Sequence, residues 1–348
     1  MKRTILLLAT WSVLMQGITQ QMDRVMVLAR AGKEGIKLRW APSKSTIWEL
    51  ANKYGYTVER YTLMRDSVPT SGAPYEVLMY PVVRPAVEAI WEPLIDEDDY
   101  AAIAAQAIYG ETFELTDSFD KDIFQVAQKT EERDHRYSFT LFAADQSFRV
   151  ATLSGLAFTD AEVKKDEKYL YRIYANIPPS ILSVDTALAF IGLSDSPPLP
   201  KIQNFRATFG DRQALLAWEK GVTEKFYNAF WIEKSVDGGD TFISITDKPI
   251  INAYSDEKAE SNTFYKIDTL ALDEAEVQYR IKGVNPFGEE GPWSAIVSGR
   301  AAKSVKAYAG ITSRKLHHDG SATIYWKFPE TQEAEIDGFA IRRVRKIK

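Results

Sequence analysis

The sequence predicts a mainly β protein built from consecutive two-layer β-sandwiches. Two stretches far apart in the chain, Tyr169–Ala175 and Val277–Asn285, place apolar residues at every second position, which is the pattern of a strand with one buried face. Aromatic residues make up 12% of the chain, and their flat side chains pack well on pleated sheets. The 348 residues suffice for two or three domains.

An internal repeat supports this prediction. Three alternating strands end in a tryptophan, and we expect Trp40, Trp218 and Trp326 each to fill a core. A second alternating strand follows each of them, over residues 56–63, 230–236 and 338–346. In each copy a strand that ends in tryptophan is followed by a loop and a second strand. This order resembles the second and third strands of fibronectin type III domains, which are immunoglobulin-like sandwiches.

The two strands named first resemble the sixth strand of the same family. The resemblance implies that Tyr169 is the corner tyrosine of the first domain, and that Tyr171 and Tyr279 belong to the cores. The second domain also matches the family over residues 277–299, including Gly291-Pro-Trp-Ser294. It has Val277 at the corner position, so we expect the corner hydrogen bond to be absent or replaced there.

The N-terminus predicts export. Lys2 and Arg3 precede a short apolar run, residues 4–15, and then a polar stretch, residues 16–21, which together are typical of a secretory signal peptide. The run is too short to span a membrane, and no later stretch is long and apolar enough. The chain has no cysteine. We therefore expect a periplasmic, outer-membrane-associated or extracellular protein.

The first domain is too long for a plain sandwich. Its middle carries an insertion of about residues 84–149 that has helical patterns, at Tyr100 up to Gly110, over 120–129 and over 131–145. A shorter helix is expected over 46–54. The predicted organisation is a signal peptide (1–20), a first fibronectin type III-like domain with this insertion (21–195), a second domain (196–302) and a partial third domain (303–348).

The insertion supplies the candidate partner-binding residues. It holds 15 acids and 6 bases, a balance that suits either a basic protein partner or a merely solvated surface. The net charge of −5 for the whole chain argues against nucleic acid as a partner. Consecutive carboxylates on a helix point in different directions, so we do not expect a Ca²⁺ site here. Trp91 and Trp293 are candidate aromatics for stacking on a sugar. The partner-binding candidates are Trp91, Asp96, Glu97, Asp98, Asp99 and Tyr100.

No set of residues predicts catalysis. The three histidines, His135, His317 and His318, do not form a ligand set with metal-site spacing. Neither a phosphate-binding glycine loop nor a nucleophile elbow is present. We expect no cofactor, no metal and no enzymatic activity.

Three functions fit these observations. The preferred hypothesis is an exported, non-catalytic scaffold or adhesion protein that binds another envelope or surface protein through the insertion. The second is an ancillary N-terminal region of a larger secreted hydrolase. The third is a carbohydrate-binding module with a glycan as partner. The third repeat has too few strands to bury its own faces, so we expect either more chain after Lys348 or completion by another chain.

Overall fold

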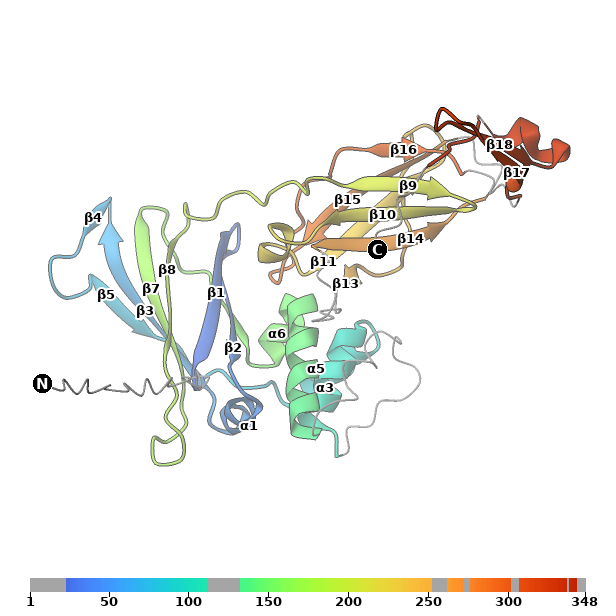
Figure 1. Ribbon diagram of the computed structural model, residues 1–348. Coiled ribbons are helices and arrows are strands. Elements are labelled where there is room, and N and C mark those ends of the chain that lie inside the picture. The colour runs from blue at the N-terminus through green and yellow to red at the C-terminus, as the bar shows by residue number, and fades with distance from the viewer. Residues whose placement is uncertain are drawn as a thin grey trace, which may run out of the picture. The chain divides into compact units, whose positions relative to one another are not determined.

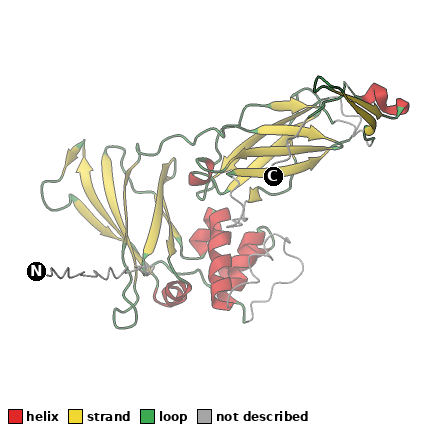
Figure 2. Cartoon of the chain, viewed as in Figure 1, coloured by secondary structure: helices red, strands yellow, loops and turns green. Residues whose placement is uncertain are grey.

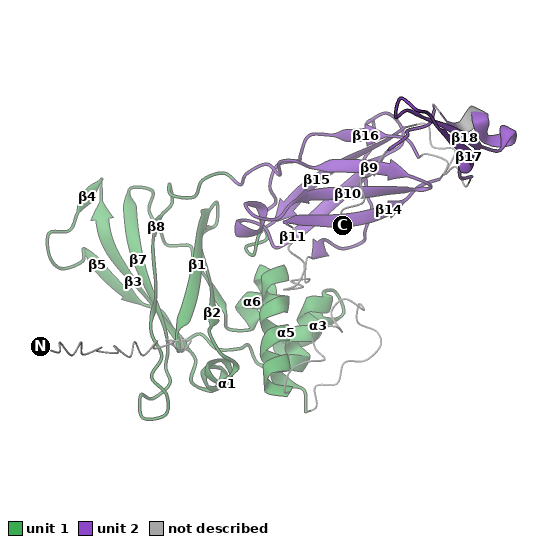
Figure 3. Ribbon diagram, in the orientation of Figure 1, with its two compact units in different colours: residues 1–198, 285–289 green, residues 199–284, 290–348 purple. Residues whose placement is uncertain are grey.

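The protein is mainly β, as predicted (Figures 1 and 2). The chain divides into two compact units, residues 1–198 with 285–289 and residues 199–284 with 290–348 (Figure 3). The predicted signal peptide lies outside the described part of the chain. Among the residues that are described, no helix has the length and apolar character needed to cross a membrane. The computed structural model describes residues 23–111, 132–251, 262–271, 276–301, 307–336 and 338–342.

The first unit contains a sandwich of two antiparallel sheets. One sheet has the order β1-β2-β6, and the other has the order β4-β3-β7-β8 with β5 beside β3. A three-stranded sheet faces a five-stranded one, in which β4 and β5 both pair with β3. This chain order is the fibronectin type III-like arrangement, so the predicted fold class is confirmed. The strands are β1 (Val25–Gly32), β2 (Gly35–Pro42), β3 (Tyr56–Arg65), β4 (Val68–Pro69), β5 (Glu76–Met79), β6 (Ala157–Asp160), β7 (Glu167–Ala175) and β8 (Ala187–Gly192).

Alternation along these strands builds the core. In β7, Tyr169, Tyr171 and Ile173 point inward and are fully buried, while the residues between them lie at the surface. Trp40 at the end of β2 is also buried, and its ring meets that of Tyr56 edge-on at 5.7 Å between centroids. Large rings from both sheets therefore fill the space between them.

The corner tyrosine of the first sandwich has the expected contacts. The Tyr169 hydroxyl accepts a hydrogen bond from the backbone N–H of Lys164 at 2.7 Å and donates one to Glu167 at 2.9 Å. Burial, as the main cause, raises the pKa of Tyr169 to about 12. The tyrosine thus fixes the loop that leads from β6 into β7.

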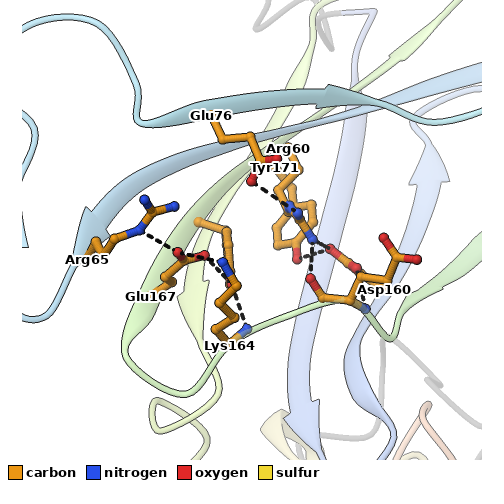
Figure 4. A network of polar contacts seen from close by, with 9 residues as sticks. Arg60, Arg65, Glu76, Asp160, Lys164, Glu167 and Tyr171 are labelled. Atoms are coloured by element: carbon orange, nitrogen blue, oxygen red, sulfur yellow. Dashed lines mark hydrogen bonds and ion pairs between the residues drawn. The ribbon is translucent and has the colours of Figure 1, made fainter.

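A buried carboxylate links three strands of the same sandwich (Figure 4). Asp160 at the end of β6 is 1% exposed and pairs with Arg60 of β3 at 2.8 Å. The Tyr171 hydroxyl of β7 donates to the same carboxylate oxygen at 2.7 Å. Arg60 also donates to the Glu162 carbonyl. A charge this deeply buried is tolerated because both partners satisfy it.

The second unit repeats the sandwich. One sheet has the order β14-β10-β9, and the other has β12-β11-β15-β16 with β13 beside β11. Trp218, Phe230 and Tyr279 are fully buried in its core. The strands are β9 (Arg206–Gly210), β10 (Gln213–Glu219), β11 (Ala229–Ser235), β12 (Ile243–Ser244), β13 (Ile250–Ile251), β14 (Thr263–Thr269), β15 (Val277–Val284) and β16 (Val297–Gly299), with a 3-10 turn η1 (Thr223–Lys225).

The polar contact of the first sandwich recurs in the second. Tyr279 donates to Asp268 at 2.6 Å, and Lys234 pairs with the same carboxylate at 3.2 Å. Lys234 lies opposite Tyr279 in the strand register, just as Arg60 lies opposite Tyr171. The corner position itself is Val277, which is fully buried. The hydroxyl of Tyr279, two residues further along, therefore anchors this strand to its neighbours.

A turn with glycines at positive φ follows β11 in the second sandwich. Gly238 and Gly239 have backbone φ angles of 82° and 100°, which residues with a Cβ atom rarely adopt. The carboxylate of Asp237 accepts hydrogen bonds from the Thr241 N–H, the Thr241 hydroxyl and the Ser235 hydroxyl. These bonds lower the pKa of Asp237. The turn belongs to the connection of residues 235–242 between β11 and β12, which pair at Lys234 and Ile243.

Helices interrupt the first sandwich at two places. Helix α1 lies between β2 and β3 and ends at Gly55, whose φ is 81°. The insertion between β5 and β6 has its own buried cluster, which includes Trp91, Ile103 and Phe139. The predicted helix over 120–129 lies outside the described residues. The helices are α1 (Ser45–Tyr54), α2 (Glu88–Ile95), α3 (Asp99–Tyr109), α5 (Glu132–Gln146) and α6 (Phe148–Leu153).

The third repeat is a hairpin of β17 (Gly310–Leu316) and β18 (Ala322–Lys327), followed by a 3-10 turn η2 (Glu330–Glu335). The prediction that Trp326 is a core residue is wrong, since its side chain is 40% exposed and its described ring contact is with Phe339. A hairpin alone offers no second sheet to cover the indole. Residues 338–342 of the predicted third strand are not a strand, and 343–348 lie outside the described part.

Replacing Asp160 should destabilise the first sandwich more than replacing Asp268 destabilises the second. Asp160→Ala removes the carboxylate nearest to the buried Arg60, whose other carboxylate neighbour, Glu76, lies 3.8 Å away. We therefore expect the free energy of unfolding of the first sandwich to fall by about 3–5 kcal/mol. Asp268→Ala affects a less deeply buried pair, and we expect about 1–3 kcal/mol in the second. Amide hydrogen exchange at increasing denaturant concentrations measures the opening free energies of β7 and β15 separately. Equal losses in both sandwiches would contradict this account.

Glu167 should make the first sandwich sensitive to acid. Burial alone raises the pKa of Glu167, but hydrogen bonds from Tyr169, Arg65 and Lys164 outweigh it, so the pKa lies below its ordinary value of 4.5. The stabilisation is complete above pH 4.5 and is lost as pH falls through the lower pKa of the folded state. Glu167→Gln should lower stability at pH 7, and its deficit should shrink below pH 4.5. Urea denaturation across pH, with Glu97→Gln as exposed control, checks this; a constant deficit would refute it.

Candidate protein-binding face of the helical insertion

The insertion is fixed to the sandwich through a buried arginine. Arg39 of β2 is 3% exposed and donates to Asp145 of α5 at 3.1 Å. It also donates to the carbonyls of Trp40 and Leu156. Burial lowers the pKa of Arg39 and raises the pKa of Asp145, while the attraction between the two charges opposes both shifts. The pair therefore connects helix and sheet: the Arg39 side chain is 3% exposed and the Asp145 side chain is 47% exposed, so loss of Asp145 would leave a buried arginine without this counter-charge.

Further contacts hold α5 on the sandwich. The Tyr137 hydroxyl donates to the Pro42 carbonyl at 2.6 Å. The hydroxyl of Ser45, at the start of α1, donates to the carboxylate of Asp134. The Trp48 ring of α1 lies 6.3 Å from that of Tyr137. These contacts hold α5 against the sandwich, so the surface of the described helices of the insertion can act as a preorganised binding site.

The predicted acidic residues lie at the junction of α2 and α3. Asp98 is the N-cap of α3, where its side chain accepts a hydrogen bond from the Tyr100 N–H at 2.9 Å. Asp96, Glu97 and Asp99 are exposed. Carboxylates are favourable at this helix end because the N–H groups there carry partial positive charge. Within the described residues, no three His, Asp or Glu side chains are grouped so as to hold a metal ion.

Trp91 does not belong to a binding surface, contrary to the sequence prediction. Its side chain is fully buried in the insertion core, and its indole N–H donates to the Ala86 carbonyl at 3.1 Å. The pattern Trp91–Leu94, three residues apart, could have indicated the inner side of a helix. Tyr100 is half-buried and packs beside Phe142, with ring centroids 6.0 Å apart. Both aromatics stabilise the insertion.

Sequence reasoning also missed α2 and its exposed apolar residues. Val87 is 68% exposed and Ile90 is 52% exposed. Acidic side chains lie between and beyond these apolar ones along the same helix. We name the exposed residues of this segment the α2 face; they are Val87, Glu88, Ile90, Glu92, Ile95, Asp96 and Glu97.

The described part of the insertion carries a strongly negative charge. Its described residues include ten acids and four arginines. Two of the arginines have acidic neighbours, since Arg136 pairs with Glu132 at 2.8 Å and Arg133 lies 3.9 Å from Asp134. The α2 face therefore combines apolar contact area with a surplus of carboxylates. Such a face suits a protein surface that is apolar and basic.

A hollow lies in the first unit, at the end of β7. Its volume is about 400 Å³, which falls within the range of small-ligand pockets. Arg172, Tyr174 and Asn176 supply polar groups, and Pro178 and Leu182 supply apolar ones. This lining can orient a small polar molecule by hydrogen bonds and a tyrosine ring.

Trp293, the other predicted stacking residue, is covered by cations. The Arg280 guanidinium lies 4.4 Å from the indole, and the Lys282 ammonium lies 4.5 Å from it. Arg280 also stacks on Phe242 at 4.0 Å and pairs with Glu233. Cations held over the ring stabilise it in place. The indole of Trp293 is thus engaged on the outside of the second sandwich.

Comparison with known proteins does not identify a family. No protein-family model matches the chain, and no curated protein matches it. Among solved structures, a β-1,2-glucanase from Parabacteroides distasonis is 15% identical with a TM-score of 0.22, covering 44% of this chain and 18% of its own length. The alpha chain of the chicken interferon gamma receptor is 10% identical with a TM-score of 0.24, covering 79% of this chain and 96% of its own.

Proposed function

We propose that this chain is an exported, non-catalytic scaffold or adhesion protein of the cell envelope or surface, which binds another protein through the α2 face. The observation that carries the proposal is a helical insertion locked to a rigid sandwich by the Arg39–Asp145 pair, with exposed apolar residues among carboxylates. The partner is a protein with a basic rim around an apolar patch. Export rests on the predicted signal peptide, and membership of the fibronectin type III group rests on the sequence resemblance.

Point substitutions test this proposal better than deletion of the insertion. Removing residues 84–149 would also remove Asp145 and leave Arg39 buried without its counter-charge. A deletion variant would therefore lose stability as well as the binding surface. Substitutions on exposed positions of the α2 face avoid this problem.

Reversing charge on the α2 face should abolish partner capture. We expect Glu88→Lys with Glu92→Lys to lose the envelope proteins that wild type retains in a pull-down, with affinity reduced about tenfold or more. The matched control, Asp211→Lys with Glu224→Lys, changes the net charge equally on exposed positions of the second unit. Binding should weaken with added salt. Equal capture by the α2-face variant and wild type would disprove the proposal.

The pocket at the end of β7 favours a second candidate function, recognition of a glycan. Its arginine, tyrosine and amide side chains match the polar and aromatic groups that orient a small polar ligand. We expect Asn176→Ala with Ser183→Ala to remove any signal of wild type on a glycan array, while circular dichroism stays unchanged. A wild-type array without signal above background eliminates this candidate.

A further inference from the structure

The hollow at the end of β7 has a cationic lining in an acidic chain. Arg172 is the one charged side chain among the described residues that line it. Asp185 lies between the lining residues Val184 and Thr186 but does not itself line the hollow. The formal charge of the lining is therefore positive, whereas the net charge of the chain is −5. Such a lining favours a ligand that carries negative charge.

Neighbouring side chains fix one side of the Arg172 guanidinium. Its Nη1 atom donates to Glu59 and to the Tyr61 hydroxyl, both at 3.0 Å. Its guanidinium carbon lies 5.7 Å from the centre of the Tyr174 ring. Glu59 is 7% exposed and also accepts hydrogen bonds from the hydroxyls of Tyr61 and Tyr174. The arginine is thus oriented before any ligand arrives, which lowers the cost of binding.

The opposite edge of the same guanidinium is open. The Nε and Nη2 atoms of an arginine form a planar fork that matches the two oxygens of a carboxylate. Arg280 donates from both of these atoms to Glu233. Arg136 does the same to Glu132. In Arg172, neither atom of the fork has a hydrogen-bond partner among the described residues, and the side chain is 41% exposed.

The remaining lining suits the hydroxyl groups of a sugar. The Asn176 amide oxygen accepts a hydrogen bond from the Thr57 hydroxyl at 2.9 Å, so the amide N–H groups can donate to a ligand. Ser183 adds an exposed hydroxyl. The loop that carries Ser183 is closed by a hydrogen bond from the Ile181 N–H to the Pro178 carbonyl at 2.8 Å. These groups lie around the same hollow as the open fork.

We propose that the hollow binds an acidic sugar, whose carboxylate accepts two hydrogen bonds from the Nε–Nη2 fork of Arg172. This inference rests on the second candidate function, glycan recognition, and adds its ligand class. Glu59 offsets the charge of Arg172, so selectivity comes from the paired hydrogen bonds more than from long-range attraction. A neutral sugar cannot offer two anionic oxygens to the fork, and it therefore binds more weakly.

A glycan array with matched pairs tests this assignment on the full chain. It carries oligosaccharides that end in glucuronate, galacturonate or N-acetylneuraminate, each beside its neutral twin with the carboxyl group reduced. We expect wild type to bind at least one acidic member about tenfold or more above its neutral twin. Arg172→Lys keeps the charge but lacks the fork, so this preference should fall about tenfold while circular dichroism stays native. The control Arg206→Lys makes the same change at an exposed position of β9 and should leave every signal unchanged.

The possible failures are distinguishable. Equal wild-type signals on the acidic and neutral twins would refute the acidic ligand class and leave glycan recognition standing. An Arg172→Lys chain that keeps the full preference would refute the role of the fork. An array without signal for any member would remove glycan recognition and this inference together. The wild-type comparison decides the ligand class without any variant, and none of these results bears on the α2 face.

Discussion

A carboxylate that receives a tyrosine hydroxyl and a cation from the opposite sheet is the constraint that both sandwiches share. Asp160 is buried at the end of β6, and Asp268 is partly exposed next to the end of β14. Burial of an unpaired carboxylate is costly, so the three strands are stable only together. This requirement fixes which strands face one another at that end. It also lets Val277 occupy the corner position, because Tyr279 supplies the cross-sheet bond.

A buried charge that needs a partner also fixes the position of α5 on the sandwich. Arg39 lies on β2 and its buried guanidinium requires the carboxylate of Asp145, which lies on α5. Moving α5 away from the sandwich would therefore leave the Arg39 guanidinium without this carboxylate. The rigidity gained here is what turns a long insertion into a surface with a defined shape.

The first unit consequently presents an exposed segment with mixed chemistry. The α2 face combines exposed apolar residues with carboxylates. A surface of this kind attracts basic molecules electrostatically and offers apolar area for contact.

The sequence by itself determined the sandwiches. Two-residue alternation and the tryptophans before a second strand placed Trp40 and Trp218 in cores, and helix-end signals located α1, α3 and α5. Tertiary structure decided the rest. Whether an aromatic is buried depends on a neighbouring element, so Trp91 lies inside and Trp326 lies partly exposed. Two ion pairs join residues that are far apart in the chain: Arg60–Asp160 and Arg39–Asp145. Local periodicity carries no information on such contacts, because strand order and register form only when the sheets pack.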